Sequence, residues 1–179
     1  MPKVVAVVGL SGAGKTSALS ALTAKHAFQH LSASLLIQEG REAGPLPATV
    51  DTLRNADIDE NQRLLIAGFK RAFDATASFV VLDGHTVIET PSGLIAVSAN
   101  VFGALGITDM IFWAAAPAEI AERRSLDASR NRPPANAEQI EAYQNEALLV
   151  AFRVCCHLKI TLNVVTDSRG PSMEKLIFG

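Results

Sequence analysis

The chain has 179 residues, a length that fits one domain of ordinary size. Apolar residues make up 49% of it, enough for a substantial core, and 16 basic against 18 acidic side chains give a formal net charge of −2. This balance argues against a dedicated nucleic-acid-binding protein, which usually carries a basic excess. No apolar stretch is long enough to cross a bilayer and the first one is too short for a signal peptide, so we expect no membrane contact and a cytoplasmic location.

Strands and helices alternate along the chain. Apolar runs predict buried strands at 4–8, 79–82 and 110–113, and the first of these is apolar on both parities. A last strand is expected at 161–165, and a short strand or turn near 28–31. Helical spacing predicts helices at 15–26, 34–41, from 57 to about 73, 99–105, 117–127 and from 136 to about 158. Residues 90–93 are expected to form a loop. Asn136 with Gln139 resembles a capping box at the start of the last of these helices, although Asn replaces the usual Ser or Thr. Such alternation favours an α/β fold with a parallel sheet covered on both faces.

Residues 9–16, Gly-Leu-Ser-Gly-Ala-Gly-Lys-Thr, match the GxxxxGK[ST] pattern of a phosphate-binding P-loop. Glycines let the backbone amides surround an anion, and the following helix adds its positive N-terminal end. We expect Lys15 to reach the β- and γ-phosphates of ATP and Thr16 to ligate Mg²⁺. The residues expected to bind the nucleotide are Gly9, Ser11, Gly12, Ala13, Gly14, Lys15, Thr16 and Ser17.

Asp83 ends the predicted strand 79–82 and is followed by Gly84 and His85. P-loop proteins place an acidic residue near the metal at such a position, and ligands of open α/β sheets bind beyond the carboxyl ends of the strands. Asp83 is therefore expected to assist in metal binding and catalysis beside the P-loop. The alternative is a turn aspartate that only caps the local backbone.

The sequence also indicates which kind of P-loop protein this is. It lacks the Asn-Lys-x-Asp motif of GTPases, the segment 83–86 after the strand reads Asp-Gly-His-Thr rather than DxxG, and a ring ATPase would usually need a longer chain. An arginine-rich cluster instead favours a phosphotransferase, because phosphoryl transfer depends on positioning and on neutralising charge. Its members are Arg123, Arg124, Asp127, Arg130 and Arg132. The alternative is a solvated helix face with an Arg123–Asp127 ion pair.

Three segments together resemble the archaeal-type adenylate kinases, which are P-loop nucleoside monophosphate kinases. They are 83–86 (Asp-Gly-His-Thr), 90–93 (Thr-Pro-Ser-Gly) and 123–132, which matches the family's Arg-Arg-x-x-Asp-x-x-Arg-x-Arg lid. The resemblance implies one domain over 1–179 with a three-layer α/β sandwich, a mostly parallel five-stranded sheet and a short lid at 124–136. It further implies ATP and Mg²⁺, a nucleoside monophosphate acceptor, and a tendency to homo-oligomers. Arg130 and Arg132 would close over the transferred phosphoryl group, with Arg124 near the adenine or the phosphates.

The sequence departs from the family at several positions. Residues 94–98, Leu-Ile-Ala-Val-Ser, replace the family's Tyr-Leu-Pro-Gly-Leu-Pro, and Pro133 stands where the lid usually ends in Asp. Aligning back from the last strand puts Ala147 and Leu148 where the family has an Asn-Arg pair facing the phosphates.

The acceptor is expected to bind residues 31–75. Ser32 lies where such kinases begin their acceptor-binding helix, Arg54 resembles the arginine that holds the acceptor phosphate, and His85 is a further candidate contact. Glu89 occupies a position that is often basic in the family, which argues for a changed substrate. Three hypotheses stay open: a nucleoside monophosphate kinase for AMP or a relative, a kinase for a small hydroxyl metabolite such as shikimate or a sugar acid, and an ATP-binding regulatory module without transfer activity.

Overall fold

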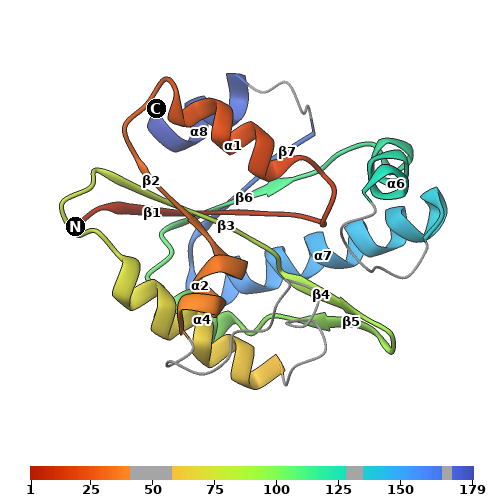
Figure 1. Cartoon of the computed structure of the whole chain (residues 1–179), viewed down its shortest axis with the longest axis horizontal. Helices are drawn as coiled ribbons and strands as arrows, with labels where there is room; N and C mark the ends of the chain where they lie inside the picture. The colour runs from red at the N-terminus through yellow and green to blue at the C-terminus, as the bar shows by residue number, and fades with distance from the viewer. Residues whose placement is uncertain (41–57, 128–134, 167–170) are drawn as a thin grey trace.

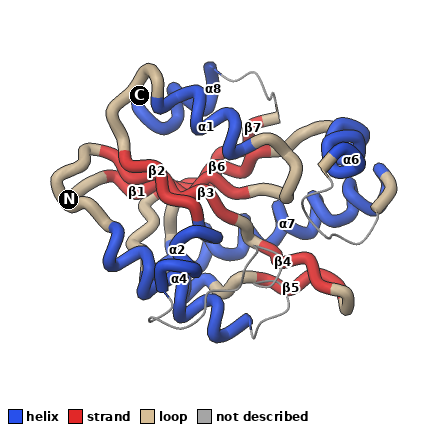
Figure 2. The backbone as a smooth tube through the Cα atoms, viewed as in Figure 1, coloured by secondary structure: helices blue, strands red, loops and turns tan. Residues whose placement is uncertain are grey.

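A computed structural model describes residues 1–40, 58–127, 135–166 and 171–179 of the chain. Its centre is a sheet of five parallel strands in the order β2-β3-β1-β6-β7 (Figure 2). The strands are β1 (Lys3–Val8), β2 (Gln29–Ser32), β3 (Phe79–Gly84), β6 (Asp109–Trp113) and β7 (Thr161–Val165). The α/β fold and the five-stranded parallel sheet are therefore confirmed.

The central strands β1, β3 and β6 formed where apolar residues occupy both parities. In β1, Val5 to Val8 are all fully shielded from solvent, and Val80 and Val81 of the neighbouring β3 are equally buried. Each buried valine contributes about 1.5–3 kcal/mol relative to an exposed one. Helices must therefore cover both faces, which fixes the three-layer arrangement.

Helices α1 (Lys15–Thr23) and α8 (Pro171–Phe178) lie on one face of the sheet, and α2 (Ala33–Gly40), α4 (Ile58–Ala72) and α7 (Ala137–Leu158) lie on the other (Figure 1). Helices α5 (Ala99–Ala104) and α6 (Pro117–Leu126) connect the later strands. The expected capping box of α7 is confirmed, because Asn136 Oδ1 accepts the Gln139 amide at 2.8 Å and Gln139 Oε1 accepts the Asn136 amide at 3.0 Å. None of the helices described is both long and apolar enough to cross a lipid bilayer.

One element of the fold was missed by the sequence analysis. The loop expected at 90–93 is the turn of an antiparallel hairpin between β4 (Val87–Thr90) and β5 (Gly93–Ala96), in which Thr90 faces Gly93. The Thr90 hydroxyl donates to the Gly93 carbonyl at 2.8 Å and tightens the turn. Each strand has only four residues and β5 is mostly exposed, so no alternating pattern is long enough to predict it.

Helices α2 and α4 approach each other at Gly68. A Cβ atom at this position would lie 1.9 Å from the Leu36 carbonyl oxygen, so only glycine allows the two backbones to come this close. The contact matters because both helices line a mostly apolar cavity beside the P-loop, which is described below.

Candidate active site

The P-loop joins β1 to α1 at the carboxyl end of the parallel sheet, where open α/β proteins bind ligands. Its glycines are required for two separate reasons. A Cβ at Gly9 would lie 2.4 Å from the Trp113 carbonyl oxygen, while Gly12 and Gly14 adopt φ of 86° and 94°, which side chains with a Cβ rarely do. Gly14 is also the N-cap of α1, so the loop leads directly onto the positive end of a helix.

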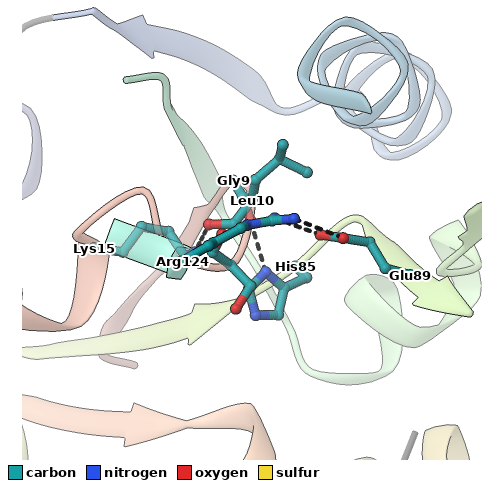
Figure 3. A network of polar contacts seen from close by, with 7 residues as sticks. Gly9, Leu10, Lys15, His85, Glu89 and Arg124 are labelled. Atoms are coloured by element: carbon teal, nitrogen blue, oxygen red, sulfur yellow. Dashed lines mark hydrogen bonds and ion pairs between the residues drawn. The ribbon is translucent and has the colours of Figure 1, made fainter. Parts of the chain in front are cut away.

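Lys15 lies across the loop and is almost completely buried. Its ammonium group donates to the carbonyl oxygens of Gly9 at 3.1 Å and Leu10 at 3.0 Å (Figure 3). The His85 Nδ1 lies 2.6 Å from the same Gly9 oxygen and must carry a proton there, because a carbonyl can only accept. These bonds hold the charged Lys15 group within the loop.

Two side chains hold the last turn of the loop. The Trp113 indole Nε1 and the Arg123 guanidinium both donate to the Ala13 carbonyl at 3.1 Å. The carbonyl and the amide of one trans peptide point in opposite directions. A donor that holds the Ala13 carbonyl therefore turns the amide of the same peptide, that of Gly14, away from that donor. This is the arrangement that lets consecutive amides form a nest for an anion.

Thr16 and Asp83 meet beside the loop. The Thr16 hydroxyl donates to Asp83 Oδ2 at 2.5 Å, and the His30 Nε2 lies 4.0 Å from the same oxygen. Burial lowers the pKa of His30, and the negative charge of Asp83 opposes that shift in part. A hydroxyl and a buried carboxylate are oxygen ligands of the kind that Mg²⁺ prefers, so these residues fit a magnesium ion bound together with phosphates and water.

A polar cavity of about 340 Å³ opens over this arrangement. It brings together most of the expected site residues: Ser11, Gly12, Gly14, Lys15, Thr16, Ser17, Ser32, Asp83 and His85. It also includes Ser34, Arg123 and Asp127, which were not among the expected binding residues. The spacing of Arg123 and Asp127 on one helical face was a signal for their proximity, but not for contact with the loop.

Two arginines of the cluster lie among the described residues, and both contact the P-loop. Arg123 pairs with Glu119 one turn earlier at 2.8 Å and reaches the Ala13 carbonyl, and Arg124 donates to the Ser11 carbonyl at 2.9 Å. The other expected residues, Arg54, Arg130 and Arg132, lie outside the described residues, as does most of the expected lid.

A second cavity of about 160 Å³ adjoins the first and shares Ser11, Ala33, Ser34 and His85 with it. Its remaining lining is mostly apolar and comes from α2, α4, α5 and the strands β3 and β4: Ile37, Leu65, Leu82, Val87, Ile88, Val97 and Phe102. Asn61, Gln62 and Glu89 add polar groups. The two cavities therefore meet at the shared residues beside the P-loop.

Ala147 and Leu148, at the positions of the family's Asn-Arg pair, line neither of these two cavities. Ala147 is buried in α7, and its carbonyl accepts the Thr86 hydroxyl at 2.7 Å. The Ala147 backbone therefore holds Thr86, the residue before β4, in this chain.

Comparisons with known proteins agree with this geometry. A family model described as an AAA domain matches residues 8–141, which include the P-loop, Asp83 and Arg123. The curated adenylate kinase of Thermococcus kodakarensis is 27% identical over 183 residues, covering 99% of this chain and 92% of that protein. It is a relative at low identity, and it supports a kinase-like phosphotransferase.

Two solved structures share the fold. Shikimate kinase from Bacteroides thetaiotaomicron superposes with a TM-score of 0.53 at 15% identity, covering 90% of this chain and 86% of that one. TT1252 from Thermus thermophilus does so with a TM-score of 0.50 at 16% identity, covering 98% and 93%. The expected relationship to P-loop kinases is confirmed: this chain belongs to the AAA domain family of P-loop proteins and is a kinase-like phosphotransferase.

Proposed function

We propose that the chain transfers the γ-phosphoryl group of ATP, with Mg²⁺, to a nucleoside monophosphate, AMP or a relative. The observation that carries the proposal is the pair of adjoining cavities, one polar above the P-loop and one mostly apolar among α2, α4 and β4, which meet at Ser34 and His85. A phosphotransferase needs two substrates held side by side, with the donor phosphates on one side and the acceptor body on the other.

The donor side fits a triphosphate with magnesium. ATP supplies the phosphoryl group, and Mg²⁺ neutralises charge on its phosphates. Lys15 would exchange its carbonyl partners for phosphate oxygens, the amides of the loop would bind the remaining oxygens, and Thr16 and Asp83 would hold the metal. Arg123 lines the same cavity and would add positive charge, so we include it with the residues expected from the sequence.

The acceptor side fits a planar ring. Phe102, Leu65 and Ile37 supply apolar contacts, and the amides of Asn61 and Gln62 lie at the same cavity. Asparagine and glutamine amides can pair with the edge of a nucleobase. Ser32 and His85 would lie at the mouth towards the phosphates, and Arg54 would hold the acceptor phosphate. The segment 124–136, with Arg130 and Arg132, would close over the reacting groups and exclude water.

A kinase for a small hydroxyl metabolite is the second candidate, and one observation favours it. Among the described residues that line the apolar cavity there is neither lysine nor arginine, and Glu89 stands at the wall where a cation would suit an acceptor phosphate. An uncharged hydroxyl acceptor needs no such cation.

A coupled ADP-release assay with ATP and Mg²⁺ separates the candidates. The acceptors are AMP, CMP, UMP and GMP, and in parallel shikimate and a set of sugar acids. We expect AMP or one related monophosphate to accelerate ADP release about 100-fold or more over ATP alone. Acceleration by a metabolite alone would favour the second candidate. ATP binding with no acceleration by any acceptor would indicate a non-catalytic module.

A further inference from the structure

A buried ion pair links the wall of the apolar cavity, which we call the acceptor wall, to the P-loop. Glu89 of β4 and Arg124 of α6 make two parallel hydrogen bonds, Nη1 to Oε2 at 2.9 Å and Nη2 to Oε1 at 2.6 Å (Figure 3). Their side chains are only 7% exposed for Arg124 and 11% for Glu89. Bidentate, charge-assisted pairs of this kind fix the orientation of the guanidinium plane as well as its place.

The same guanidinium holds one peptide of the P-loop. Arg124 Nε and Nη2 donate to the Ser11 carbonyl oxygen at 2.9 and 2.8 Å. Because a trans peptide directs its carbonyl and amide to opposite sides, this contact turns the Gly12 amide away from Arg124. Ser11 and Gly12, the two residues joined by this peptide, both line the polar cavity.

This peptide needs an external support, because its conformation depends on a glycine. Gly12 has φ of 86°, and glycine populates positive and negative φ about equally, so the Ser11–Gly12 peptide can flip at little steric cost. A flipped peptide would present the Ser11 carbonyl to the phosphates in place of the Gly12 amide. The Arg124 stem also packs on this residue, since a Cβ at Gly12 would lie 3.1 Å from Arg124 Cγ.

We propose that Glu89 is a positioning residue: acting through Arg124, it fixes the Ser11–Gly12 peptide so that the Gly12 amide faces the phosphates of the bound nucleotide. Glu89 also lines the apolar cavity, so the pair ties the acceptor wall to the donor loop. The inference rests on the triphosphate binding of the proposed function, but it is independent of the acceptor's identity.

The test is the affinity for Mg²⁺-ATP, measured by calorimetry, together with thermal unfolding of each variant. We expect Glu89→Ala and Arg124→Ala each to weaken ATP binding about tenfold or more, the range of a lost charge-assisted hydrogen bond. Glu122→Ala, an exposed position on the same helix as Arg124, is the matched control and should stay within about twofold. The Gly12 amide resonance of the ¹⁵N-labelled protein should shift on adding ATP in the wild type and lose that shift in Glu89→Ala.

The double variant Glu89→Ala/Arg124→Ala separates positioning from a merely structural role. It removes both charges, so it should recover the melting temperature lost by the single variants, which leave one buried charge unpaired. ATP affinity should nevertheless stay as low as in Arg124→Ala, because Glu89 acts only through that arginine.

Three results would overturn the inference. They are wild-type ATP affinity in Glu89→Ala, recovery of ATP affinity together with the melting temperature in the double variant, and no ATP binding by the wild type. ATP binding that depends on Glu89, in a chain that phosphorylates no monophosphate, would contradict the proposed function and leave this inference standing.

Discussion

The two cavities that meet at Ser11 and His85 are built by different means. The donor cavity is formed largely by the backbone of one continuous loop, whose glycines and Lys15 are set by their neighbours in sequence. The acceptor cavity is formed by side chains from α2, α4, α5, β3 and β4, which only the tertiary packing brings together. The difference explains why the P-loop cavity could be predicted from a general sequence pattern, whereas the apolar cavity could not.

The largest effect on ATP binding and phosphoryl transfer is expected from Lys15→Ala. The ammonium group is the buried cation of the loop, so its loss should reduce phosphoryl transfer by about 100-fold or more and weaken ATP binding, as measured by the coupled assay and calorimetry. Lys70→Ala, which removes an exposed lysine of α4, should change neither. Full turnover of Lys15→Ala would show that the P-loop is not the catalytic site.

Changing Gly68 to Ala should destabilise the packing of α2 against α4, two helices that line the apolar cavity. The new Cβ would overlap the Leu36 carbonyl of α2, and the free energy of unfolding should fall by about 3 kcal/mol in urea denaturation. Gly103→Ala is the matched control, because its Cβ would meet only the end of the Leu158 side chain, at 3.2 Å. Equal stability of the two variants would refute the close α2–α4 approach.

Filling the apolar cavity should weaken binding of the acceptor without affecting binding of ATP. Ile37→Trp places a larger ring among the acceptor-side residues, so KM for the monophosphate should rise about tenfold while ATP affinity stays within about twofold. Leu35→Trp adds the same ring at a neighbouring exposed position and serves as the control. A rise in the ATP dissociation constant with unchanged acceptor KM would reverse the assignment of the cavities.

The smallest effect is expected far from both cavities, where α8 docks near α1. Hydrogen bonding to His26 is the main cause that lowers the pKa of Glu174 from its ordinary value of 4.5. A carboxyl group with a depressed folded pKa stabilises the fold above its ordinary pKa, and that contribution is lost as the pH falls through the folded value. Between pH 6 and 3 the melting temperature should therefore fall more steeply in the wild type than in Glu174→Gln, with ATP affinity at pH 7 alike in both. Parallel melting curves would contradict the role of this pair.

The sequence predicted features that depend on neighbouring residues. It located the P-loop, the strand ending at Asp83 and the capping box of Asn136, because each is encoded within a few positions. It missed the β4–β5 hairpin, whose strands are too short for a periodic signal. It also missed the Glu89–Arg124 pair, since the partners are 35 positions apart and each has other plausible roles in sequence. The P-loop cavity could thus be predicted from local sequence patterns, whereas the apolar cavity depends on long-range packing that such patterns do not encode.

The central claim is that the donor and acceptor cavities hold two substrates for direct transfer between them. The most direct measurement follows the label from [γ-³²P]ATP after incubation with Mg²⁺ and AMP, with product identity determined by chromatography. The account predicts labelled ADP formed from AMP, in amounts that disappear in Lys15→Ala. Label found only in inorganic phosphate, or no loss of label from ATP while ATP remains bound, would contradict it.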